Sequence, residues 1–101
     1  MYYIYFIYSK SADKYYIGHS TDPWIRLEQH NSNESYKFTG KYKPWELKAL
    51  FEVSERKGDA DKIEKYLKRQ KSRKLILQLI NPDYMPDREL VQLVRVPYVR
   101  N

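Results

Sequence analysis

The sequence contains no cysteine, which excludes disulfide bonds and thiolate metal sites. It has no apolar run near the roughly 20 residues that a membrane-spanning helix requires. The first residues lack the basic stretch and the small-residue cleavage site of a secretory signal peptide. Internal repeats and low-complexity tracts are also missing. These absences predict a cytoplasmic globular protein that does not associate with membranes.

The length and composition suit one small domain. The chain has 101 residues, and compact domains usually contain about 50–200. Hydrophobic residues make up 42% and aromatic residues 16%, so a modest core can form. Tyrosine contributes 11 residues, and its ring can be buried while its hydroxyl stays at the boundary with water. We therefore expect tyrosines to line the edge of the core.

The positive charge is concentrated in one segment. The net charge is +6, and residues 62–74 hold seven bases and one acid, Glu64, which accounts for the whole excess. A local basic patch suits a polyanion such as nucleic acid. The alternative is an ordinary solvated helix face, which has the same composition. The seven bases are Lys62, Lys65, Lys68, Arg69, Lys71, Arg73 and Lys74.

The first third of the chain predicts a hairpin followed by a helix. Residues 2–8 are β-branched or aromatic throughout, which predicts a strand buried on both faces. Residues 14–18 predict a second strand, antiparallel to the first. Asp22 and Pro23 suit the cap and the first position of a helix that continues to about His30.

The middle of the chain predicts a loop and a third strand. Asn31–Pro44 is polar and reads as a long loop. Residues 46–53 alternate in hydropathy, which predicts a strand. Leu50 breaks the alternation. The predicted inner face consists of Leu47, Ala49, Phe51 and Val53.

Two helices are predicted next, the first capped by Asp59 and the second by Ser72. Asn81-Pro82 ends the second helix. The order β-β-α-β-α-α predicts an α+β fold, with a small three-stranded, mostly antiparallel sheet flanked by helices. We assign residues 1–80 to this domain and 81–101 to an irregular tail, with an extended Leu90–Val96 segment as an option. The predicted inner faces are Ile63, Tyr66 and Leu67, then Leu75, Ile76, Leu79 and Ile80.

Five side chains could together carry phosphodiester chemistry. Tyr5 and Tyr16 lie on paired strands, so their rings can share a face. Arg26 and His30 are four positions apart on one helix, which places them on the same side. Glu64 is the lone acid of the basic segment. The set supplies phenols and an imidazole for proton transfer, a cation for a phosphate oxygen and a carboxylate for a hard divalent ion.

Each of these residues also has an ordinary structural interpretation. A tyrosine among 11 is more often a packing residue, and a single histidine is more often a satisfied surface residue. Arg26 could pair with Glu28 or Asp22. Glu64 could be an i,i+4 partner of Lys68. Taken one at a time, these interpretations are favoured.

The combination resembles the GIY-YIG nuclease superfamily. Residues 3–5, Tyr-Ile-Tyr, and 16–18, Tyr-Ile-Gly, are similar to its two name motifs, with Tyr3 in place of the first glycine. Larger members carry an Asn after the Glu, where this chain reads Leu75-Ile76-Leu77. The resemblance, over residues 2–80, is closest to the small stand-alone bacterial branch, related to the N-terminal nuclease domain of the bacterial excision-repair incision subunit. The other matching positions are Arg26, His30, 37–39, 45–47 and 64–74.

The resemblance implies an endonuclease that cuts DNA with Mg²⁺ or Mn²⁺, favours branched or flapped DNA, and acts in repair or recombination. Tyr16 would take the proton from the attacking water, helped by His19 or by Tyr5. Arg26 would stabilise charge on the phosphate. In this family pattern His30 assists proton transfer or orients Tyr5, and Glu64 holds the metal ion. Gly18 would keep the backbone thin where the substrate approaches, and Lys37 with the seven bases would bind DNA.

Two other functions remain open from the sequence. One is a non-catalytic nucleic-acid-binding module of the same fold, which would bind through residues 62–74 with a steep salt dependence. The other is a protein-interaction domain with an incidental basic helix, which we rank last. The sequence favours no particular oligomeric state.

Overall fold

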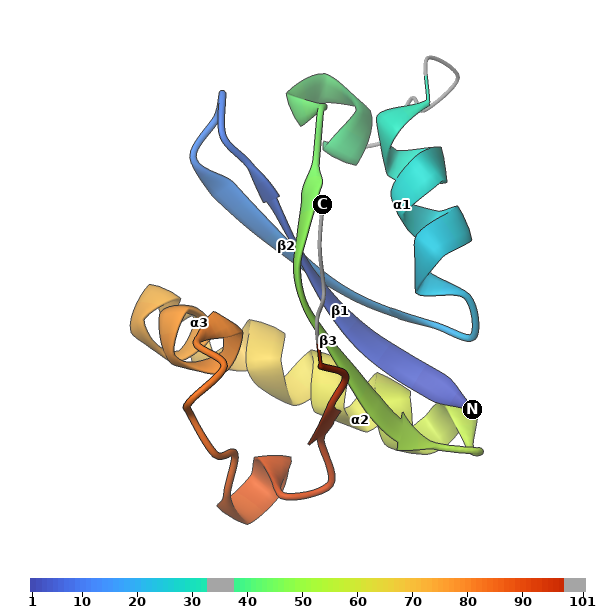
Figure 1. Ribbon diagram of the computed structural model, residues 1–101, viewed down its shortest axis with the longest axis vertical. Helices are drawn as coiled ribbons and strands as arrows, with labels where there is room; N and C mark the ends of the chain where they lie inside the picture. Colours follow the sequence, from blue (N-terminus) through green and yellow to red (C-terminus); the bar gives the residue numbers. More distant parts are fainter. Residues whose placement is uncertain (33–37, 98–101) are drawn as a thin grey trace.

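The computed structural model describes residues 1–32 and 38–97 of the chain. Within these residues the chain forms a four-stranded antiparallel sheet of order β2-β1-β3-β4, with helices on both faces (Figure 1). This confirms the α+β fold and adds a short fourth strand. The elements are β1 (Tyr2–Ser9), β2 (Lys14–Ser20), α1 (Pro23–Asn31), the 3-10 turn η1 (Phe38–Tyr42), β3 (Glu46–Ser54), α2 (Lys57–Gln70), α3 (Arg73–Ile80), the 3-10 turn η2 (Arg88–Leu90) and β4 (Val94–Arg95).

The sheet separates two layers of helix, with α1 on one face and α2 and α3 on the other (Figure 1). The central strand β1 is buried on both faces, as its unbroken apolar sequence predicts. Ile4 and Phe6 point into the larger core, with α2 and α3. Tyr5 and Ile7 point to the α1 side. The same strand therefore supplies both the core and the phenol of the candidate site.

The predicted inner face of β3 is wrong at Leu47. This residue packs on the α1 side with Leu50, whereas Ala49 and Phe51 pack on the α2 side. The pairing with β1 shifts at this point, since Phe6 pairs with Ala49 but Ile7 pairs with Leu47. Lys48 is thus an extra residue in β3, and a bulge of this kind changes the face that the strand presents.

Two of the three predicted helix caps are confirmed. The Asp22 carboxylate accepts a hydrogen bond from the backbone N–H of Ile25 at 3.1 Å. The Ser72 hydroxyl accepts one from Leu75, also at 3.1 Å. Asp59 is not a cap, because α2 begins two residues earlier and its carboxylate accepts a hydrogen bond from the Ser54 hydroxyl at 2.7 Å. An acid in the first turn still interacts favourably with the helix dipole.

The segment after α3 packs against the larger core. Leu90 and Leu93 are each 5% exposed. Arg95 in β4 donates hydrogen bonds to the carbonyl oxygens of Leu79, at 2.8 Å, and Tyr84, at 3.0 Å. Its guanidinium also lies 4.7 Å from the centre of the Phe51 ring. The predicted tail thus contains η2 and β4. Within the predicted extended segment Leu90–Val96, only Val94 and Arg95 form a strand.

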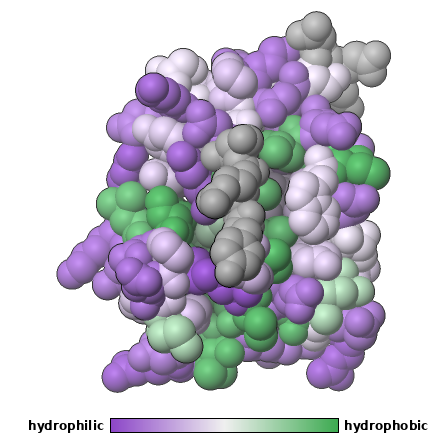
Figure 2. Space-filling view, viewed as in Figure 1, coloured by the Kyte–Doolittle hydropathy of each residue, from purple (hydrophilic) through white to green (hydrophobic). Residues whose placement is uncertain are grey.

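The surface carries separate hydrophobic patches among hydrophilic side chains. Figure 2 shows such patches over α3 and near η2. The exposed large hydrophobic residues of these segments are Leu77, Met85 and Val91. None of the helices within residues 1–32 and 38–97 is long and apolar enough to cross a membrane.

Truncating the buried leucine before β4 should destabilise the whole domain. We expect Leu93→Ala to lower the free energy of unfolding by about 2–5 kcal/mol, because it leaves a cavity in the larger core. The control Val91→Ala, at a side chain that is 71% exposed, should change it by less than about 0.5 kcal/mol. Urea unfolding of both variants measures this. Equal stabilities would show that the segment after α3 does not contribute to the core.

Candidate active site

The glycine of the second motif makes room for the tyrosine of the first. β1 and β2 pair with Tyr5 directly opposite Gly18. A Cβ atom at position 18 would overlap the hydroxyl and ring carbons of Tyr5. No side chain can fit there while Tyr5 keeps its place. The expectation that Gly18 thins the backbone for substrate is therefore corrected, since the space beside it is filled by Tyr5.

Tyr5 is joined to His30 of α1 in the buried part of the site. The Tyr5 hydroxyl and His30 Nε2 form a hydrogen bond of 3.0 Å. Burial raises the pKa of Tyr5 to about 12, against the lowering effect of the nearby Arg26 guanidinium. Burial, together with the positive charge of Arg26, lowers the pKa of His30 to about 4. At neutral pH both groups are thus uncharged, and His30 is not the surface residue of the ordinary interpretation.

Tyr16 lies next to this pair and is half-buried. Its ring centre is 5.1 Å from that of His30 and 6.3 Å from that of Trp45. The amino group of Lys68 lies 5.0 Å from the centre of the Tyr16 ring. Tyr16 therefore connects the buried pair to the charged residues of α2.

Glu64 binds a partner with each of its carboxylate oxygens. Oε2 accepts a hydrogen bond from Lys68 at 2.7 Å, which is the i,i+4 pair of the ordinary interpretation. Oε1 is hydrogen-bonded to His19 Nδ1 at 2.5 Å. The side chains of Glu64 and His19 are 17% and 18% exposed. The carboxylate is thus held at the edge of solvent, and Lys68 links it to the ring of Tyr16.

Arg26 lies on α1, exposed to solvent, and its charge acts on Tyr5 and His30. Its Nη1 donates a hydrogen bond of 2.8 Å to the side chain of Gln29. Within the described residues, Arg26 forms no ion pair with Glu28 or Asp22. Gln29 was not predicted as the partner of Arg26, although the i,i+3 spacing of the two residues on a helix indicates that they can meet.

The structure brings together the six residues singled out as catalytic. Contacts run from Tyr5 through His30 and Tyr16 to Lys68, and from Lys68 through Glu64 to His19. Arg26 belongs to the same group because its positive charge acts on Tyr5 and lowers the pKa of that phenol. We call this set the site cluster: Tyr5, Tyr16, His19, Arg26, His30 and Glu64.

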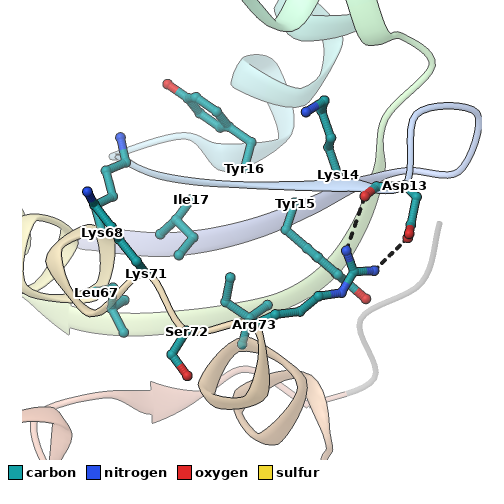
Figure 3. A pocket seen from close by; sticks show the side chains of 11 residues that line it. Asp13, Lys14, Tyr15, Tyr16, Ile17, Leu67, Lys68, Lys71, Ser72 and Arg73 are labelled. Atoms are coloured by element: carbon teal, nitrogen blue, oxygen red, sulfur yellow. Dashed lines mark hydrogen bonds and ion pairs between the residues drawn. The ribbon is translucent and has the colours of Figure 1, made fainter.

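The basic residues line two different hollows. Lys68, Lys71 and Arg73 line a hollow beside Tyr16, which Figure 3 shows from close by. Lys62 and Arg69 line a different hollow, together with Glu89 and Gln92 near η2. The other predicted DNA-binding residues are Lys65, which pairs with Asp61 at 3.0 Å, Lys74, which is exposed, and Lys37, which lies outside the described residues.

Glu64 is the residue of the site cluster that could hold a divalent metal ion. In the part of the chain that the structure describes, no three His, Asp or Glu side chains form a metal site by themselves. One carboxylate at the edge of solvent nevertheless fits Mg²⁺, which usually keeps several water ligands and is completed by substrate phosphate. The oxygen donor at this position therefore fits the ion.

The family model of the GIY-YIG catalytic domain matches residues 1–76. The chain belongs to the GIY-YIG family. Membership implies nuclease activity in general and a nucleic acid substrate, and GIY-YIG nucleases generally use divalent metals. No curated protein and no solved structure matches the chain. The matched region runs from β1 into α3 and contains the whole site cluster.

The packing of Tyr5 against Gly18 can be tested with the two glycines of β2 and α2. Gly18→Ala should lower the free energy of unfolding by about 1–3 kcal/mol, because the new methyl group meets the buried Tyr5 ring. Gly58→Ala, in α2 with nothing within 4 Å, should be neutral or stabilising by up to about 1 kcal/mol. Thermal unfolding compares the two variants. A Gly18→Ala protein as stable as Gly58→Ala would contradict this packing.

The buried imidazole should make stability depend on pH in a definite window. The folded chain keeps His30 neutral down to about pH 4, whereas the unfolded chain binds a proton below about pH 6.5. The contribution of His30 to the free energy of unfolding is therefore fully present above pH 6.5. It falls by about 3 kcal/mol at most as the pH is lowered to 4. The difference in unfolding free energy between wild type and His30→Gln should shrink over this window.

Urea unfolding of the two proteins at pH 7, 5.5 and 4 measures that difference. Wild type and His30→Gln share every other titrating group. The contribution of the carboxylates therefore cancels when one free energy of unfolding is subtracted from the other. A difference that is constant, or that grows as the pH falls, would show that His30 does not stay neutral in the folded chain.

Proposed function

We propose that this GIY-YIG protein is an endonuclease that hydrolyses phosphodiester bonds in DNA with Mg²⁺ or Mn²⁺ bound at Glu64. The observation that supports this is the set of contacts around a half-buried phenol, Tyr16: its ring neighbours the amino group of Lys68, which binds the Glu64 carboxylate. The exposed guanidinium of Arg26 acts on His30, whose ring lies 5.1 Å from that of Tyr16. Ordinary packing does not require a phenol, a cation and a carboxylate to lie near one another, whereas a phosphodiester hydrolase can use all three.

The two tyrosines are suited to different tasks. Tyr5 is 1% exposed and its pKa is raised to about 12, so it holds its proton and positions His30. Tyr16 is half-buried, can be reached by water, and is the phenol that we assign to the attacking water. His30 is neutral and lies between them, so one ring nitrogen can accept a proton while the other donates. In this assignment His30 assists the proton transfer from Tyr16 and orients Tyr5.

The charged residues would act on the phosphate. Arg26 is exposed and can reach a phosphate oxygen, where a guanidinium stabilises developing negative charge. A divalent ion at Glu64 supplies further positive charge on the phosphate and the leaving oxygen. Lys68 and His19 hold the two carboxylate oxygens and keep Glu64 directed toward this place. His19 thus acts on Glu64 in our assignment, rather than on Tyr16.

The choice of substrate follows from what these residues contact. Phosphate contacts position a protein on DNA but do not read its sequence. We therefore propose selection by DNA structure, such as a branch or a flap, and a role in repair or recombination. Placement in the small stand-alone bacterial branch of the family is part of the same proposal.

Removing the carboxylate should abolish cleavage without abolishing binding. We expect Glu64→Gln to lower the rate of DNA cleavage with Mg²⁺ by about 100-fold or more, because the oxygen ligand of the ion is lost. DNA affinity should stay the same or rise slightly, since a repelling charge is removed. A nicking assay and fluorescence anisotropy on the same branched DNA measure the two effects.

The matched control is Asp61→Asn, which removes one negative charge from the same helix one turn earlier. Asp61 pairs with Lys65 and is 42% exposed. Its substitution should leave cleavage within about twofold of wild type. If wild type never cuts branched, flapped or duplex DNA with Mg²⁺ or Mn²⁺ but binds it, the protein is a non-catalytic binding module and the proposal fails.

A further inference from the structure

A hollow of about 430 Å³ lies between the outer edge of β2 and the corner where α2 meets α3. Figure 3 shows Tyr15 and Ile17 on the side of β2 that faces α3, while Tyr16 lies on the other side. This volume is in the range of about 300–1,000 Å³ that is typical of small-molecule sites. We call this cavity the β2-edge hollow.

Three cations stand around the β2-edge hollow, with one carboxylate: Lys68, Lys71 and Arg73 against Asp13. Lys14 also borders it, but its side chain points away, on the same side of β2 as Tyr16 (Figure 3), and its amino group lies 5.4 Å from the centre of the Tyr42 ring. The carboxylate is already engaged, since Arg73 binds it at 2.5 Å and the Tyr8 hydroxyl donates to it at 2.7 Å. The amino group of Lys71 forms no ion pair or hydrogen bond with residues 1–32 or 38–97. The rim therefore carries a net positive charge, which complements a phosphate.

The floor of the β2-edge hollow is apolar. It consists of Ile17 and Leu67, which belong to the inner faces of β2 and α2, and Ile76 of α3. Tyr15 forms one wall, with the Arg73 guanidinium 5.1 Å from its ring centre. An apolar floor beneath a cationic rim matches a nucleotide, whose base is flat and apolar on its faces and whose phosphate is anionic.

The β2-edge hollow is continuous with the site cluster. Tyr16 and Lys68 both line it. Lys68 also binds Glu64 and lies over the Tyr16 ring, so the two places share a wall. A nucleotide in the hollow would thus neighbour a phosphate at the site cluster, one step along the same strand.

We infer that the β2-edge hollow binds one unpaired nucleotide of DNA, adjacent to the phosphate that is cut. This inference rests on the nuclease function proposed above and names its substrate class as DNA with a single-stranded flank. A paired base is stacked on both faces and cannot reach the apolar floor, whereas an unpaired base can. Lys71 and Arg73 of the rim hold its phosphate, and Ile17, Leu67 and Ile76 contact its base.

The test compares DNA binding by two double variants that each remove two positive charges. Lys71→Asn/Arg73→Gln changes the rim, and Asn suits the left-handed backbone at position 71, where φ is 46°. Lys62→Gln/Arg69→Gln is the control, because these residues line the other hollow. Each protein is titrated, without divalent metal, into a duplex with an oligothymidine flap and into the same duplex with blunt ends, at physiological salt.

We expect the rim variant to bind the flap about tenfold more weakly, with a smaller loss on blunt duplex equal to that of the control. An abasic nucleotide at the first unpaired position should weaken wild type about fivefold or more and the rim variant much less. Equal losses for both double variants on both DNAs, or no effect of the abasic nucleotide, would overturn the inference. Because no cleavage is measured, a protein that shows the flap-selective loss but never cuts loses the nuclease proposal and keeps the binding site.

Discussion

The packing of the Tyr5 ring over Gly18 is the constraint on which the site depends. It requires β1 and β2 to pair in the observed register, since a shift of one residue would place a side chain against the ring. It also directs the Tyr5 hydroxyl to His30, which sets the position of α1 on the sheet. Arg26, one turn earlier on α1, is thereby brought to the same side. The two short motifs of the sequence are thus one steric unit, formed by a ring and by the space that a missing side chain leaves.

The site cluster combines a neutral inner part with a charged outer part. Tyr5 and His30 are buried and uncharged at neutral pH, because desolvation disfavours both ionised forms. Glu64 and Arg26 lie at the edge of solvent and carry opposite charges. Tyr16 lies between the two parts. This arrangement keeps proton-carrying groups away from bulk water while leaving the charged groups accessible to a metal ion and a phosphate.

Much of the fold could be predicted because its signals are local. The apolar run of β1, the cap at Asp22 and the i,i+4 spacing of Arg26 and His30 each depend on a few neighbouring residues. The errors depend on distant ones. The face of Leu47 is set by a bulge against β1, the start of α2 by a hydrogen bond between Asp59 and Ser54, and β4 by Arg95 contacts with α3. The division of the bases between two hollows likewise follows from how α2 packs, which composition does not reveal.

The central claim is that the site cluster forms one place for a metal ion and a phosphate. Paramagnetic broadening of amide NMR signals by Mn²⁺, in the presence of a short DNA, tests it most directly. We predict that the signals of Tyr16, His19 and Glu64 broaden first, and that those of Glu89 and Gln92 in the other hollow broaden last. Broadening centred on Glu89 and Gln92, or spread evenly over the molecule, would contradict the account.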